Sequence, residues 1–224
     1  MTAPARPSRK LRVLTTLAAV LAVLITAAVI TAARSSDDEA APGEPGGFPV
    51  SVVRPDSHRL STAPDGRVTF VEFLDFECEA CRAAYPIVEK LREEYGDRVT
   101  FVVRYFPIPS HFNAERAARA VEAAAQQGRF EQMYQRMYET QAGWGEQRVP
   151  LDNVFREFAA DLGLDLAAYD AAYNDPATLT RVQADFNDGI ALGVQGTPTF
   201  FINDEMIAAG SYEELTAALD TALG

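Results

Sequence analysis

The two cysteines of this chain, Cys78 and Cys81, stand where one sequence pattern gives way to another. Before them, residues 67–75 are almost continuously apolar, which is typical of a strand buried on both faces of a sheet. After them, apolar residues recur at helical spacing from Glu79 to about Tyr95, and Gly96 follows. The sequence therefore predicts that both cysteines lie where a central strand ends and a helix begins.

The remaining pattern places this junction within a mixed α/β domain. A second buried strand is predicted over residues 98–106, and the strand–helix–strand order favours a parallel pair. Trp144, between two glycines, is predicted in a loop, where it would line a groove or anchor nearby helices. The other predicted elements are a short edge strand over 50–53, a helical block within about 110–192, short strands over 199–203 and 205–209, and a last helix after Ser211.

The N-terminal part of the chain has the features of a membrane anchor followed by a tether. Residues 13–33 carry no charge, and at about 1.5 Å per residue they are long enough to cross a hydrocarbon core of about 30 Å. Basic residues precede this run, and an acidic, Pro- and Gly-rich stretch follows it. The positive-inside rule then predicts a cytoplasmic tail over 1–12, a transmembrane helix over 13–33, a flexible linker over 34–49 and an extracytoplasmic domain over 50–224.

This arrangement is that of a single-pass protein of the cell membrane. A cleaved signal peptide is the alternative interpretation of residues 13–33, since small residues at 31–33 would suit cleavage. Both interpretations put the domain outside the cytoplasm, where a disulfide can persist.

Charge and composition exclude several classes of function. The net charge of the chain is −12, and its first 34 residues contain bases but no acid, so the remainder is more acidic still. Such a domain repels phosphate groups, which argues against binding nucleic acid. Two cysteines and two histidines are too few for a disulfide-rich scaffold, a four-cysteine zinc site or a histidine-rich metal site. We therefore predict neither a resident metal nor a cofactor.

The position of the cysteines suits redox chemistry. A thiolate at a helix N-terminus faces unpaired backbone N–H groups and the positive end of the helix dipole, and both lower its pKa. Two intervening residues allow the sulfurs to close a small, reversible disulfide. We expect Cys78 to be the exposed attacking thiol and Cys81 its buried partner. A static disulfide and an inert pair are the other interpretations.

Two further positions are candidates for the same site. Glu72 shares a strand face with apolar residues, so we expect its carboxyl to be largely buried, with a raised pKa, and able to exchange a proton with Cys81. A hydrogen-bonded carboxyl at the rim is the alternative for Glu72. Thr197-Pro198 comes just before a predicted strand, where an X–Pro bond is a candidate for the cis form.

Three motifs together resemble the DsbA-like branch of the thioredoxin superfamily, which includes membrane-anchored bacterial members. They are VEFLDFECEAC at the strand–helix junction, Pro86 inside the following helix and GTPTFFIN near the C-terminus. The resemblance covers residues 50–224. It implies an α/β, thioredoxin-like fold with an inserted helical subdomain, here preceded by one N-terminal transmembrane helix.

The resemblance also implies roles for individual residues. Cys78 would attack and Cys81 resolve, Pro198 would be cis beside the pair, and the Thr197 backbone would pair with an extended substrate peptide. The strongest oxidases of this branch carry Pro-His between the cysteines, whereas Glu77 and Glu79 flank Cys78 here. Because negative neighbours disfavour a thiolate, we expect a less acidic Cys78 and a less oxidising pair than in those enzymes.

The sequence thus predicts a membrane-tethered thiol–disulfide oxidoreductase that oxidises cysteines of exported client proteins. The resemblance and the compartment imply a second, quinone-linked membrane protein that reoxidises it. A disulfide reductase or isomerase is the alternative within the class. A copper metallochaperone, in which His111 joins the two cysteines as a ligand, and a catalytically silent binding module are alternatives from other classes.

Overall fold

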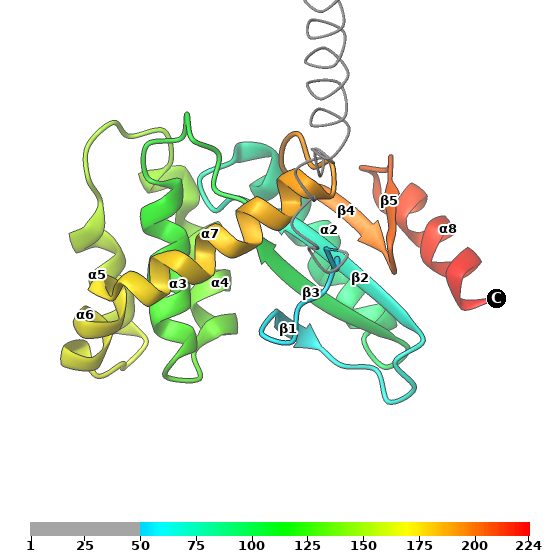
Figure 1. Cartoon of the computed structure of the whole chain (residues 1–224), viewed down its shortest axis with the longest axis horizontal. Coiled ribbons are helices and arrows are strands. Elements are labelled where there is room, and N and C mark those ends of the chain that lie inside the picture. The colour runs from blue at the N-terminus through cyan, green and yellow to red at the C-terminus, as the bar shows by residue number, and fades with distance from the viewer. Residues whose placement is uncertain (1–49) are drawn as a thin grey trace, which may run out of the picture. The chain divides into compact units, whose positions relative to one another are not determined.

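The two apolar runs of the sequence become neighbouring central strands of a five-stranded sheet. The computed structural model describes residues 50–224 (Figure 1). The strand order is β1-β3-β2-β4-β5, in which β2 and β3 are parallel and all other neighbours are antiparallel. The strands are β1 (His58–Ser61), β2 (Val68–Leu74), β3 (Val99–Tyr105), β4 (Thr199–Ile202) and β5 (Glu205–Ile207).

Helices cover both faces of this sheet and form a separate block at its end. The helices are α2 (Glu79–Tyr95), α3 (Ala114–Ala125), α4 (Phe130–Trp144), α5 (Asp152–Asp161), α6 (Leu166–Asn174), α7 (Pro176–Ala191) and α8 (Tyr212–Leu223). Figure 1 shows α3 to α6 standing beside the sheet, with α7 leading from that block back toward β4. Of the helices between β3 and β4, α3 to α6 therefore form the inserted part of a thioredoxin-like fold, and α7 covers the second face of the sheet.

The hydrophobic core has three parts, one on each face of the sheet and one inside the helical block. Side chains of α2 and α8, such as Val88 and Leu219, pack with Phe70 on one sheet face. Val71 and Phe73 point to the opposite face, where they pack near the end of α7. The helical block has its own core, which reaches the sheet through Leu74 at the end of β2 and includes both cysteines. The cysteines thus lie where the sheet core and the helical core meet.

Most elements form where the sequence predicts them. The helix after the cysteines has the predicted bounds, it contains Pro86, and Gly96 caps it. Asp175 caps α7 with Pro176 in its first turn, and Ser211 with Glu214 forms the capping box of α8. Local capping chemistry is strong enough to mark these helix ends without help from the rest of the fold.

The edge strand predicted over residues 50–53 is wrong, because β1 begins at His58. The backbone of the earlier segment has another partner. Arg104 donates from Nη1 to Val52 O at 2.6 Å and to Ser51 O at 3.3 Å. The carbonyl groups of Ser51 and Val52 therefore accept hydrogen bonds from a buried guanidinium, and not from a neighbouring strand as the predicted edge strand would require.

The same arginine fixes α7 to the sheet. Arg104 is fully buried in β3, and its Nε and Nη2 donate to Asp185 and Asp188 of α7, each at 2.6 Å. Asp185 also accepts the Tyr105 N–H at 3.1 Å. A buried charge persists only when it is paired in this way, so the register of α7 on β3 is tightly specified.

The predicted N-terminal tail, transmembrane helix and linker all fall within residues 1–49, outside the described residues. Within residues 50–224, no helix is both long enough and apolar enough to cross a membrane.

Close packing of α7 on the sheet depends on Gly189. A Cβ at this position would lie 2.7 Å from the ring of Phe106 and 3.1 Å from that of Phe73. We expect Gly189→Ala to lower the free energy of unfolding by about 1–3 kcal/mol, because neither buried ring can move freely. Gly143→Ala in α4 is the matched control, since nothing lies within 4 Å of its added methyl group.

The control should be neutral or stabilising by up to about 1 kcal/mol, because alanine favours helix over glycine. Urea unfolding of both variants measures the difference. Equal free energies for the two variants would show that α7 does not pack closely at Gly189.

Candidate functional site

Cys78 lies in the turn between β2 and α2 and is the N-cap residue of α2. Its backbone is extended (φ −70°, ψ 123°), and its side chain does not cap the helix. The Cys78 N–H donates to Asp75 O at 3.2 Å. The Cys78 sulfur is therefore free to act chemically while the turn beneath it is held by the main chain.

The carboxylate of Asp75 holds this turn from below. It is buried, and it accepts the Glu77 N–H at 2.8 Å and the Ile108 N–H at 2.9 Å. His111 Nδ1 lies 2.6 Å from Asp75 Oδ2, and this hydrogen bond raises the pKa of His111. Asp75 thus joins the cysteine turn to the segment that follows β3.

The inserted helices hold the same turn from the side. Gln141 of α4 is buried, and its Nε2 donates to Phe76 O at 2.7 Å and to Cys78 O at 2.9 Å. Neither Asp75 nor Gln141 was among the residues that the sequence singled out. The available signals were weak: a carboxyl at the end of an apolar strand, and an amide on the apolar side of a helix.

The two cysteines are free thiols in very different surroundings. Cys78 is 8 % exposed and Cys81 is not exposed, so Cys78 is less exposed than predicted. A hydrogen bond from the Cys81 thiol lowers the pKa of Cys78 to about 5, against burial, with a further contribution from the Thr197 side chain. Burial raises the pKa of Cys81 well above its usual range.

The pair is thus built to ionise at one sulfur only. Near neutral pH Cys78 is a thiolate and Cys81 keeps its proton. The acidic neighbours weighed from the sequence do not prevent this, because Glu77 turns away from the sulfur. Its carboxyl accepts the Asn113 N–H at 2.5 Å, and burial raises its own pKa.

Glu72 lies in the middle of β2, opposite Val103 of β3 and Phe200 of β4. It is 2 % exposed, and burial raises its pKa to about 8, assisted by the negative charges of Glu89 and Cys78. Its own charge contributes to the raised pKa of Cys81. A neutral carboxyl therefore lies near the buried thiol, as burial on this strand face predicts, rather than at the rim.

Thr197 and Pro198 lie against the attacking sulfur. The peptide bond between them is cis, and the Cys78 Sγ donates to Thr197 O at 3.4 Å. Thr197 Oγ1 is buried without a hydrogen-bond partner in the described part of the chain, so its proton is available when the Cys78 thiol ionises. The structure therefore brings together Cys78, Cys81, Thr197 and Pro198 as a group, with Glu72 behind them.

Two other residues considered from the sequence, Trp144 and His111, make contacts that hold the fold together. Trp144 is not in a loop: it is the last residue of α4, it is buried, and it packs edge-on against Phe155 at a ring distance of 5.0 Å. It therefore anchors the helical block rather than lining a groove. His111 is occupied by Asp75, and no group of three or more potential metal ligands occurs within residues 50–224.

Comparison with known proteins identifies relatives of this region. Residues 59–221 match a family model described as thioredoxin. The chain is 34 % identical over 164 residues to the Na(+)/H(+) antiporter NhaA of Herminiimonas arsenicoxydans, covering 73 % of this chain but 25 % of that protein. It is 32 % identical over 170 residues to NhaA 1 of Mycobacterium sp. strain KMS, covering 74 % and 27 %. The chain thus spans about a quarter of the length of these curated relatives.

Solved structures share the fold. A thioredoxin-like oxidoreductase from Silicibacter pomeroyi DSS-3 superimposes with a TM-score of 0.65 at 28 % identity, covering 77 % of this chain and 95 % of that one. Oxidised BdbD from Bacillus subtilis superimposes with a TM-score of 0.66 at 22 % identity, covering 75 % and 92 %. Alpha-DsbA1 from Wolbachia pipientis superimposes with a TM-score of 0.64 at 20 % identity, covering 76 % and 90 %.

The buried state of Glu72 predicts how stability depends on pH. Its folded-state pKa of about 8 lies above the ordinary value of 4.5, so the folded chain binds the proton more tightly than the unfolded chain. The resulting stabilisation is present at low pH and is lost as the pH rises through about 8. Glu72→Gln keeps the shape but cannot ionise.

We expect Glu72→Gln to be more stable than the parent above pH 8, by on the order of 2–3 kcal/mol, and similar to it near pH 4. Denaturant unfolding of both proteins across this pH range measures the difference, and other titrating groups largely cancel in the comparison. Parallel stability curves at all pH values would contradict the buried, neutral carboxyl.

Proposed function

Since the chain belongs to the thioredoxin family, we propose that it is a thiol–disulfide oxidoreductase that works through a reversible Cys78–Cys81 disulfide. The observation that carries this proposal is the placement of the two thiols: Cys78 is the N-cap residue of α2, with its sulfur 3.4 Å from Thr197 O, and Cys81 is fully buried. These different surroundings lower the pKa of Cys78 to about 5 and raise that of Cys81. A difference between the two cysteine pKa values has no role in an inert pair of thiols. An exchange catalyst needs it, because one sulfur must attack or leave readily while the other waits.

The reaction that this arrangement supports begins with the disulfide form. A client thiolate attacks Cys78 Sγ, a client–Cys78 disulfide forms, and the Cys78–Cys81 bond breaks. The electron pair leaves on Cys81, which takes a proton from the neutral carboxyl of Glu72. A second client thiolate then attacks the client sulfur of the mixed disulfide, and Cys78 leaves as a thiolate. Two electrons have passed from the client to the cysteine pair.

Oxidation of clients is the direction that we propose. A stabilised Cys78 thiolate favours the reduced pair, and a pair that is stable when reduced is a strong oxidant. Cys78 is also the better leaving group of the two, since a lower pKa makes a thiolate leave faster. A disulfide reductase or isomerase remains the alternative, and the reduction potential separates it from an oxidase.

The proposed clients are exported proteins that contain cysteines. An extended client segment would pair with the backbone at Thr197, next to the attacking sulfur, in the manner of an added strand. We propose that residues 13–33 anchor the chain in the cell membrane, with the catalytic domain outside the cytoplasm. A quinone-linked membrane oxidoreductase would then take the two electrons from the reduced pair. The uncharged run of residues 13–33 and the basic residues before it support this location.

The reduction potential tests the direction of electron flow. We expect equilibration with glutathione to give a potential nearer to that of a strong oxidase, about −120 mV, than to that of thioredoxin, about −270 mV. The measurement follows the oxidised and reduced forms by mass after acid quenching. A potential at the thioredoxin end of the range would make the chain a reductase.

Trapping tests the two cysteine roles separately. Cys81→Ala should accumulate disulfide-linked client adducts through Cys78, because no resolving thiol can release them. Cys78→Ala should accumulate none, since the remaining thiol is buried and holds its proton. Non-reducing electrophoresis of extracts from cells that express each full-length variant measures the adducts. Equal trapping by both variants would overturn the assignment of attacker and resolver.

A further inference from the structure

Two exposed loops of the helical block lie beside the cysteine turn. One leads from β3 to α3 and includes Phe112, and the other leads from α4 to α5 and includes Arg148 and Val149. Residues 146–150 are all exposed, Phe112 is 43 % exposed, and Val149 is 54 % exposed. Two of the five large apolar side chains that are exposed within residues 50–224 are thus found on these loops.

Asn113 holds the two loops together. It is fully buried, and its side-chain amide donates to Gln147 O at 2.8 Å and to Val149 O at 3.1 Å. Its Oδ1 accepts the Leu151 N–H at 3.2 Å, and its backbone N–H donates to Glu77 Oε2 at 2.5 Å. The loops are therefore fixed relative to the cysteine turn, and a surface that is fixed in advance loses little entropy on binding a partner. Apolar side chains exposed on such a surface commonly mark a binding site.

Two pockets extend from the cysteine turn across these loops. The first, of about 100 Å³, is lined by Glu77, Phe112 and Arg148, among others. The second, of about 410 Å³, reaches α7 at Phe186. The two pockets adjoin, because His111 and Phe112 line both of them. The first pocket also borders the residue that precedes the attacking cysteine.

Charge distinguishes this surface from the rest of an acidic chain. Arg148 is exposed and has no ion-pair partner within residues 50–224, whereas Arg116, on the other loop, pairs with an aspartate at 3.3 Å. Of the acids in the first pocket, Glu77 is engaged by the Asn113 N–H and Glu146 is exposed to solvent. An unpaired guanidinium beside exposed apolar side chains is complementary to a segment that carries both a carboxylate and an apolar residue.

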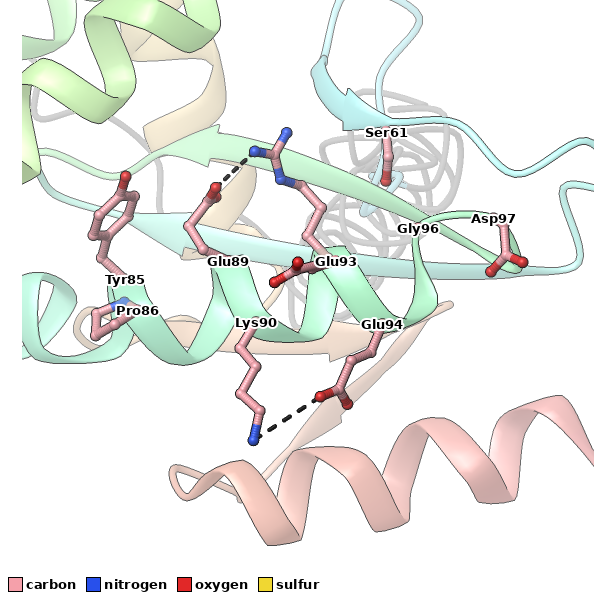
Figure 2. A pocket seen from close by; sticks show the side chains of 10 residues that line it. Ser61, Tyr85, Pro86, Glu89, Lys90, Glu93, Glu94, Gly96 and Asp97 are labelled. Atoms are coloured by element: carbon pink, nitrogen blue, oxygen red, sulfur yellow. Dashed lines mark hydrogen bonds and ion pairs between the residues drawn. The ribbon is translucent and has the colours of Figure 1, made fainter.

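The pocket along α2 does not offer the same chemistry. It is larger, about 880 Å³, and its lining includes Glu89, Glu93 and Glu94. Its two cations are both paired with glutamates, Lys90 with Glu94 and Arg92 with Glu89, as Figure 2 shows. A carboxylate would be repelled there, so the two loops beside the cysteine turn are the better match for an acidic segment.

We propose that Phe112, Arg148 and Val149 form a client-binding surface that selects cysteines flanked by an apolar residue and a carboxylate. This inference deepens the proposed function and rests on it, because the partner is the client whose thiolate attacks Cys78. The client segment pairs with the Thr197 backbone and then crosses the attacking sulfur to the helical block. There its apolar side chain contacts Phe112 and Val149, and its carboxylate pairs with Arg148.

Oxidation of matched peptides by the full-length chain tests this selection. Each peptide carries two cysteines and a Leu-Glu pair placed at successive positions on either side of them, and a second set carries Leu-Gln instead. At low salt we expect Leu-Glu peptides to be oxidised about 5-fold faster than Leu-Gln peptides at one or two placements, which is what an exposed ion pair can contribute. Repulsion by the acidic domain would slow Leu-Glu peptides at every placement, so acceleration at particular placements identifies a local cation. Each rate is divided by the rate of the same protein with dithiothreitol.

Charge variants test the role of Arg148. Arg148→Gln should abolish the advantage of Leu-Glu, and Glu146→Gln should enlarge it by removing a competing carboxylate. Arg129→Gln is the matched control and should keep the advantage. Arg129 is also exposed and without an ion-pair partner in the described part of the chain, but it caps the opposite end of α4. An advantage that no placement shows, or that survives Arg148→Gln, would overturn the surface.

Amide NMR of the full-length chain separates this inference from the proposed function. A Leu-Glu peptide with serine in place of each cysteine can bind but cannot react. It should shift the signals of Arg148 and Val149 to saturation, and Val149→Ser should weaken its binding about 5-fold. If dithiothreitol is oxidised but these signals do not shift, the surface is wrong and the oxidoreductase stands.

Two other outcomes are equally decisive. If the signals shift but dithiothreitol is not oxidised, the oxidoreductase is wrong and the peptide-binding surface stands. If the same signals shift when the chain alone is concentrated, and Val149→Ser removes that shift, the surface binds a second copy and its role in client selection is overturned.

Discussion

One buried carboxylate, that of Asp75, holds the active turn in place. The backbone N–H groups of Glu77 and Ile108 and the ring of His111 form hydrogen bonds with this carboxylate. The backbone carbonyl of Asp75 accepts a further hydrogen bond from the Cys78 N–H. Burying a carboxylate is costly unless donors surround it, and here three do. The turn after β2 is thereby fixed to the segment after β3, and Gln141 completes it from α4. The sheet and the inserted helices must both be in place before Cys78 is presented correctly.

The chemistry then follows from a contrast across this turn. Above it, the helix N-terminus, the Cys81 thiol and the Thr197 hydroxyl favour a negative charge on Cys78. Below it, burial keeps protons on Cys81, Glu72 and the tyrosines of α4. The pKa values of the two sulfurs therefore differ because Cys81 is buried more deeply than Cys78. A charged side chain between the two cysteines is not required for this difference. This explains why glutamates beside Cys78 do not prevent a low pKa.

The sequence was sufficient for the features that depend on local patterns. Continuous apolar runs predicted β2 and β3, helical spacing predicted α2, and capping residues predicted the ends of α7 and α8. Burial of Glu72 followed from strand alternation alone. The cis bond at Pro198 was expected only through the resemblance, because an isolated X–Pro step favours trans.

What the sequence could not predict depends on partners distant along the chain. The bonds of Asp75 to Ile108 and His111, and of Gln141 to Phe76, join segments that no local pattern connects. The predicted strand at residues 50–53 failed for the same reason, since a buried arginine of β3 binds that backbone. The direction in which the Glu77 carboxyl points, toward the Asn113 N–H, is likewise a tertiary property.

Selective alkylation of the reduced chain tests the contrast between the two sulfurs most directly. At pH 6, with iodoacetamide in equal amount to protein, peptide mass mapping should find the label on Cys78 and none on Cys81. The rate of labelling should rise with pH along a single titration centred near pH 5, the pKa of the Cys78 thiol. Label divided between the two cysteines, or a rate that begins to rise only above pH 8, would contradict the account.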